Sequence, residues 1–242
     1  MMLKSFTTVA AAALLAGACH FSADAEERDP GPQVSRNYQV GAFEKIAVAG
    51  PYEVNVVTGG QPGVSATGGE NLLSETDVVV EDGTLKIMPK KRKGIRWSWT
   101  NNGKAVFTVN AAMLRKAAIA GSGGISIDKI AGDFEGDVAG SGDLRLASVA
   151  GGAVKLSIAG SGDVTAAGKA DSVDLSIAGS GDINAGGLAT RAAEVSIAGS
   201  GSVSANASMT ADVSIMGSGD VDITGGAKCN VSKHGSGNVR CG

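Results

Sequence analysis

The stretch Ser157-Ile-Ala-Gly-Ser-Gly-Asp-Val164 returns with few changes from Ser176, from Ser196 and from Ser214. The triplets Gly-Ser-Gly at its centre begin at Gly121, Gly140, Gly160, Gly179, Gly199, Gly217 and Gly235. Their successive intervals are 19, 20, 19, 20, 18 and 18 residues. A near-constant period of this length is typical of a solenoid, in which each repeat forms one coil.

Apolar and polar residues alternate on both sides of each triplet. Val154, Leu156 and Ile158 precede Gly160, and Val164 and Ala166 follow it, with polar residues in most of the places between. Alternation with a period of two residues indicates half-buried strands. Each coil is therefore a strand, a tight glycine turn, a second strand and a second turn. We predict an all-β fold, a single-stranded parallel β-helix (β-solenoid) with Gly-Ser-Gly-Asp coils of about 19 residues.

The glycines follow from this arrangement, because a turn stacked on identical turns needs positive φ angles and close backbone approach. The last repeat departs from the pattern. Cys229 and Cys241 take inward positions six residues before and six residues after Gly235. These positions should face each other across the core, so we predict a Cys229–Cys241 disulfide that closes the final coil. Lys233, where other coils have Ile, also marks a solvent-facing end.

The N-terminal half is less regular. Ile46–Val56 places apolar residues before and after Gly50 at the offsets of the later coils. Asp77–Val80 and Thr84–Ile87 indicate a hairpin-like pair, and Ala105–Val109 indicates another strand.

These patterns divide the chain into three parts. The solenoid domain is expected to cover residues 37–242, with degenerate opening coils and regular repeats from about residue 115. Residues 26–36 are expected to form a flexible leader.

Residues 1–25 have the features of an export signal, with Lys4 followed by the apolar run Phe6–Ala18. Two processing sites compete. Ala23-Asp24-Ala25 fits cleavage before Glu26, whereas Leu14–Cys19 is similar to a lipobox that would make Cys19 a lipidated first residue. We expect an exported protein, in the periplasm or at the cell surface, with membrane attachment only if Cys19 is lipidated. The net charge of −3 gives no sign of nucleic-acid binding.

The sequence resembles the head GIN domain family of bacterial auto-transporter adhesins (DUF2807). The matching parts are Phe43–Gly50, Gly69–Leu73, Asp82–Ile87 and the Ala-Gly-Ser-Gly-Asp repeats. The resemblance implies an exported β-solenoid. It implies no catalytic residues.

The first candidate site is a column of Asp side chains, one in most coils. Stacked carboxylates offer oxygen ligands to Ca²⁺. The alternative, which we favour, is that each Asp bonds backbone N–H groups of its own turn, as Asn and Ser also do. The column consists of Asp143, Asp163, Asp182 and Asp220, with Ser202 and Asn238 at the equivalent positions of other coils.

A polysaccharide-active β-helix enzyme, either a lyase or a hydrolase, is the rival class of function. Such enzymes place Asp clusters or a basic residue in a groove, and the outward residues Arg145, Asp143 and Asp163 are the candidates for this arrangement. A catalytic pair needs one locally tuned site, and a column repeated in every coil is the opposite of that. We therefore predict no enzyme activity, no catalytic residues, no metal and no cofactor.

The best binding candidate is the basic and aromatic segment Lys90–Trp99. Cations beside aromatic rings suit anionic glycans and lipid headgroups. The alternative is that the tryptophans cover the open first coil. The candidate ligand-binding residues are Lys91, Arg92, Lys93, Arg96, Trp97 and Trp99.

The sequence thus predicts a non-catalytic, adhesin-like or structural envelope module. Its expected partner is a glycan, a lipid headgroup or an envelope protein. A lipid-anchored structural protein is the third alternative, and the oligomeric state does not follow from the sequence.

Overall fold

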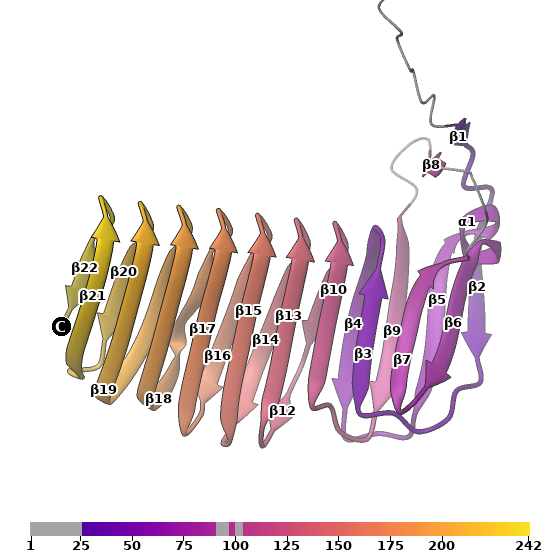
Figure 1. Cartoon of the computed structure of the whole chain (residues 1–242). Helices are drawn as coiled ribbons and strands as arrows, with labels where there is room; N and C mark the ends of the chain where they lie inside the picture. The colour runs from indigo at the N-terminus through magenta and orange to yellow at the C-terminus, as the bar shows by residue number, and fades with distance from the viewer. Residues whose placement is uncertain (1–25, 91–96, 100–103) are drawn as a thin grey trace, which may run out of the picture.

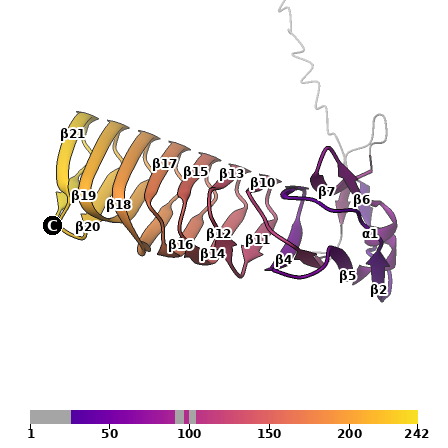
Figure 2. The same ribbon diagram turned by 90° about the horizontal axis from the view of Figure 1, so that it is seen from below.

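The computed structural model describes residues 26–90, 97–99 and 104–242, and every structural statement here concerns those residues. Its strands stack as parallel coils along one axis (Figure 1), which confirms the all-β solenoid fold. The coils build two long ladders of strands, called sheet A and sheet B below. Figure 2 shows the ladders as two layers along the solenoid.

Sheet A holds the strand that precedes each glycine turn. In spatial order from the N-terminal end, its members are β6 (Thr76–Glu81), β7 (Thr84–Pro89), β3 (Lys45–Ala49), β10 (Lys116–Gly121), β13 (Phe134–Gly140), β15 (Ala153–Gly160), β17 (Ser172–Gly179), the second halves of β18 (Ile183–Gly199) and β19 (Ser202–Gly217), and β21 (Lys228–Gly235).

Sheet B holds the strand that follows each turn. Its members in the same direction are β2 (Gln33–Tyr38), β5 (Gly63–Gly69), β9 (Ala105–Ala111), β4 (Tyr52–Thr58), β11 (Gly124–Ile127), β14 (Asp143–Ala150), β16 (Val164–Lys169), the first halves of β18 and β19, β20 (Asp220–Thr224) and β22 (Val239–Cys241). The short strand β12 (Ile130–Ala131) pairs with the end of β14, beyond a register shift.

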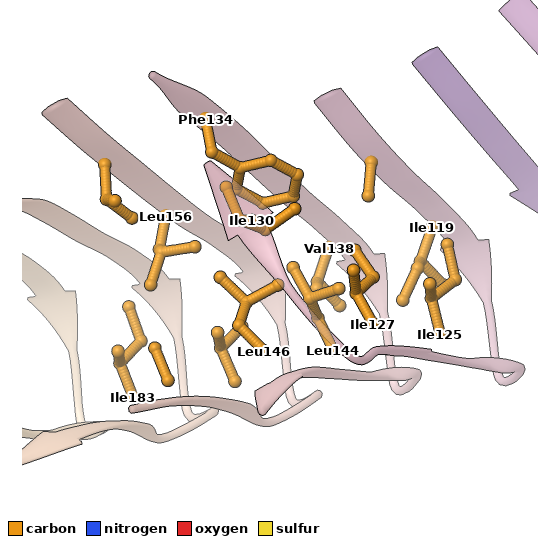
Figure 3. Packing of buried hydrophobic residues seen from close by; sticks show 14 of the residues in the cluster. Ile119, Ile125, Ile127, Ile130, Phe134, Val138, Leu144, Leu146, Leu156 and Ile183 are labelled. Carbon is orange, nitrogen blue, oxygen red and sulfur yellow. The ribbon is translucent and has the colours of Figure 1, made fainter. Parts of the chain in front are cut away.

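The core is a thin layer of aliphatic side chains between the sheets. Leu156 of β15 pairs in register with Leu175 of β17, and Val164 of β16 pairs with Ile183 of β18. All four side chains are buried, because each lies at an inward position of the two-residue alternation. Figure 3 shows Leu156, Ile183 and neighbouring side chains in this layer.

The glycine turns have the geometry that the repeat predicts. Gly160 has φ +138°, and a Cβ atom on it would lie 2.3 Å from the carbonyl oxygen of Gly140 in the preceding coil. A Cβ atom on Gly162, the third residue of the same triplet, would lie 2.1 Å from the oxygen of Gly142. The first glycine therefore serves both conformation and close approach, whereas the third serves close approach alone.

The order of the first coils differs from the order of the chain. The β6–β7 hairpin forms as predicted, since the two strands pair antiparallel. However, β7 and β9 stack outside β3 and β4, while β10 and β11 stack on the inner side of β3 and β4. In chain order, the coil of β3 and β4 therefore comes first, and the coil of β7 and β9, which stacks outside it, comes next. The chain then returns to the inner side of β3 and β4, where β10 and β11 continue the solenoid. Local alternation could not show this, because every strand has the same apolar face.

The N-terminal boundary also differs from the expectation. Gln33–Arg36 was expected in a flexible leader, but it forms the first part of β2, antiparallel to β5. The opening of the domain is therefore an antiparallel addition to sheet B and not a degenerate coil. The short helix α1 (Glu70–Ser74) follows β5 and buries Leu72 and Leu73 against the core. This helix covers core residues at the N-terminal end.

At the opposite end, the predicted Cys229–Cys241 disulfide is confirmed, with the two Cα atoms 6.5 Å apart. Lys233 occupies the inward register next to Ile215, and its Nζ donates a hydrogen bond of 2.7 Å to the carbonyl of Gly237. Val231 is 45% exposed although it continues the inward column of Val213. The last coil is therefore closed by a covalent link and a lysine instead of a further layer.

Candidate functional site

The predicted basic and aromatic segment falls largely outside the described residues, which is where Lys91, Arg92, Lys93 and Arg96 lie. Trp97 and Trp99 belong to strand β8 (Trp97–Trp99), which pairs parallel with β1 (Glu26–Arg28). The two strands form a small separate sheet (Figure 1). Residues 1–25, the expected export signal with Cys19, also lie outside the described residues.

The predicted Asp column connects neighbouring coils. Oδ1 of Asp163 accepts the backbone N–H of Asp182 at 3.1 Å, and Oδ1 of Asp182 accepts the N–H of Ser202 at 2.7 Å. Asp143 and Asp220 accept the N–H of Asp163 and of Asn238 in the same way, at 3.3 and 2.8 Å. The sequence favoured a bond within each Asp's own turn, whereas the structure places the donor in the next coil.

Ser202 and Asn238 can stand in the column because each donates its backbone N–H, which every side chain at that position leaves in place. Each carboxylate fastens two coils together and needs no metal for that role. Among the described residues, no group of three or more His, Cys, Asp or Glu side chains is arranged to hold a metal ion.

The outward face of sheet B carries a second polar column beside the Asp column. The two columns come from positions three and five residues after the first glycine of each triplet. At the C-terminal end they flank a shallow groove with a volume of about 340 Å³. It is lined by the strand segments at Ile183, Val203 and Val221, whose side chains are buried in the core, and by the outward residues Asp182, Asn184, Ser202, Ser204, Asp220, Asp222, Asn238 and Arg240.

Two charged side chains of this groove are unengaged. Asp222 and Arg240 lie in register on β20 and β22 and are both exposed. Within the described part of the chain, neither side chain forms an ion pair or a hydrogen bond, with each other or with any other residue. Ser204 and Asn184 are linked by a 3.0 Å hydrogen bond from Oγ to Oδ1. The groove thus offers a free carboxylate and a free guanidinium beside hydroxyl and amide groups.

The outward face of sheet A carries charges that mostly satisfy one another. Lys116 Nζ lies 2.8 Å from both Glu135 and Asp137, and Lys155 Nζ lies 2.9 Å from Asp174. Hydrogen bonds to Asp137 and Glu135 raise the pKa of Lys116, and the bond to Asp174 raises the pKa of Lys155. A second groove of about 360 Å³ lies on this face, with Lys155, Asp174, Glu194 and Asp212 among its lining residues.

The groove on sheet B was not found from the sequence, although its residues are visible there. The two polar columns are visible in the sequence as the positions three and five residues after the first glycine of each triplet. The sequence does not show which charged side chains pair with each other across coils. In the described part of the structure, Lys155 and Asp174 form such a pair, whereas the side chains of Asp222 and Arg240 are free.

Stacked coils with repeated polar columns define a repeat protein of the β-solenoid class. The sequence profile of the family "Putative auto-transporter adhesin, head GIN domain" matches residues 42–227. The chain therefore belongs to this family, as its resemblance implied. No curated protein matches the chain.

Solved structures share the fold over nearly the whole domain. A "putative adhesin" from Bacteroides fragilis NCTC 9343 is 24% identical, with a TM-score of 0.77 over 88% of this chain and 98% of that one. A "Putative lipid binding protein" from Parabacteroides distasonis ATCC 8503 is 28% identical, with a TM-score of 0.71 over 89% of this chain and 100% of that one. No helix among the described residues combines the length and the apolar character that a membrane crossing requires.

Proposed function

We propose that the protein is an exported, non-catalytic, adhesin-like module that binds an extended ligand along a face of its solenoid. The observation that carries this proposal is the groove on sheet B, where every coil supplies the same two polar positions. A surface of repeated positions suits a repetitive ligand, because the same contact recurs with each coil. Membership in a family of adhesins and the export signal of residues 1–25 support the assignment.

The arrangement of charges argues against the rival enzyme. A glycosidase or lyase needs an acid and a base with separately tuned pKa values at one point. Asp143 and Asp163, the carboxylates considered with Arg145 for an active site, each accept a backbone N–H of the next coil. Asp182 and Asp220 fasten neighbouring coils in the same way.

Lipid binding is kept as a second candidate because one similar structure is described as a putative lipid binding protein. The basic segment Lys91–Arg96 would meet anionic headgroups by charge. This binding would involve a different part of the chain from the groove.

A binding screen on residues 26–242 tests the proposal. It should include neutral, amino-bearing and acidic oligosaccharides and anionic and zwitterionic vesicles, with product analysis for every glycan that binds. We expect binding without cleavage. Cleavage products would show that the protein is an enzyme, and failure to bind any member of the panel would refute the binding role. A W97A/W99A double variant, which retains the groove, separates headgroup binding from groove binding.

A further inference from the structure

The groove on sheet B runs along the solenoid axis and crosses four strands. The first halves of β18 and β19, together with β20 and β22, contribute outward side chains to its walls, and Asp182 and Asn238 lie directly before β18 and β22. Neighbouring strands lie about 4.8 Å apart, so the outer two of these strands are about 14 Å apart. The spacing of one strand is close to the length of one sugar in an extended glycan chain.

We propose that this groove binds an extended β-linked glycan without acidic groups, with about one sugar on each coil. This inference rests on the proposed function, because it names the ligand of the same binding face.

The chemistry of the walls supports hydroxyl-rich ligands. Oδ1 of Asp182 and of Asp220 is occupied by a backbone N–H, and no bond to either Oδ2 is present among the described residues. Asp222 contributes a complete carboxylate, and Arg240 donates from its guanidinium. Carboxylates accept hydrogen bonds from sugar hydroxyls, and the guanidinium donates to ring or hydroxyl oxygens.

The balance of charge selects against acidic glycans. Asp182, Asp220 and Asp222 supply three negative charges, and Arg240 supplies one positive charge. A carboxylate or phosphate on the ligand would meet repulsion from like charges at two of the four coils, those of Asp182 and of Asp220 and Asp222. The groove on sheet A is a poorer candidate, because Lys155, Asp174 and Asp212 already have side-chain partners.

The test compares three hexasaccharides, namely β-1,4-linked glucose, glucosamine and glucuronate, by calorimetry with residues 26–242. We expect the first two to bind and the acidic one to bind at least about tenfold more weakly, as a single repelled charge requires. Ser204→Trp fills the groove and should weaken binding of the neutral hexamer by about tenfold or more. Its matched control is Ser196→Trp, the same change on the outward face of sheet A, which should leave the affinity within about twofold.

A second pair of variants removes charge without adding bulk. Asp222→Ala should weaken binding of the glucosamine hexamer, whereas Glu194→Ala, a carboxylate on sheet A, should not. If Ser204→Trp does not fold, Asp222→Ala and Glu194→Ala still test whether the groove on sheet B binds the glycan. Glycan affinity that survives both Ser204→Trp and Asp222→Ala overturns the inference, as does preference for glucuronate. Binding of vesicles but of no hexamer also overturns the inference while leaving the broader binding role intact.

Discussion

Replacing Gly162 by alanine tests whether glycine is needed for close approach between coils. Gly162 lacks the positive φ angle of Gly160, so conformational strain plays no part. The new Cβ would lie 2.1 Å from the carbonyl oxygen of Gly142 and 2.8 Å from Cγ1 of Val138. Real Cβ contacts essentially never fall below 3.0 Å, so the two turns must separate.

The cost follows from the bonds that join these turns. The N–H groups of Ser161 and Gly162 both donate to Gly140, at 2.8 and 3.1 Å, and the N–H of Asp163 donates to Asp143 at 3.3 Å. Separation by about 1 Å disrupts these three hydrogen bonds, each worth about 1 kcal/mol. We expect Gly162→Ala to lower the free energy of unfolding by about 3 kcal/mol.

Two other glycines separate steric clash from backbone strain. Gly151 has φ +80° and open space around it, so Gly151→Ala should cost only the strain of the left-handed conformation, about 1 kcal/mol. Gly60 has neither feature, and its alanine variant should stay within about 0.5 kcal/mol of wild type. Guanidinium denaturation followed by circular dichroism gives the midpoints. Equal midpoints for Gly162→Ala and Gly151→Ala would refute the close-approach argument.

Three further predictions concern the ends and the charged face of the solenoid. Cys229→Ser/Cys241→Ser should lose about 3 kcal/mol, the closure entropy of a loop with a sequence separation of 12, and dithiothreitol should lower the denaturation midpoint of wild type but not of the variant. Tyr52→Phe removes a 3.0 Å hydrogen bond between the hydroxyl and Thr76, so the midpoint should fall by the equivalent of about 1 kcal/mol, and an unchanged midpoint would show that the buried bond is unimportant. Lys116 has a pKa raised above 10.5, so its ion pairs add stability below that pH, and this stability is lost as the pH rises through the raised pKa. The stability difference between wild type and Lys116→Met should therefore be constant near neutral pH and vanish in strong alkali. A difference that persists in strong alkali would argue that Lys116 stabilises by packing instead.

The fold was accessible from the sequence because a solenoid repeats its information. Each Gly-Ser-Gly triplet and its flanking alternation specify the same coil, so seven copies support one interpretation. The disulfide was accessible for the same reason, since Cys229 and Cys241 occupy positions whose inward direction the other coils establish. The hydrogen-bond partner of each Asp was missed because donors in the same turn and in the next coil are equally compatible with the spacing.

The N-terminal half lacks this redundancy, and there the spatial order of the strands escaped prediction. Tyr52, in the coil of β3 and β4, makes a buried contact that the regular coils lack. It stands two residues after Gly50, where the regular coils have the third glycine of the triplet, and it is fully buried. Its ring packs edge-on against Phe107 of β9, with centroids 5.5 Å apart, and its hydroxyl reaches Thr76 at the start of β6.

One aromatic side chain thus joins the inner coil to the outer coil and to the hairpin beyond it. Such a contact fixes which strand stacks outside β3 and β4, yet it depends on residues 24 and 55 positions away in the sequence, Thr76 and Phe107. The repeats extend the solenoid by one local rule, whereas closing its first end takes a contact between distant residues. Because the groove on sheet B lies among the last regular coils, substitutions at Tyr52 should lower stability while leaving glycan affinity in that groove unchanged.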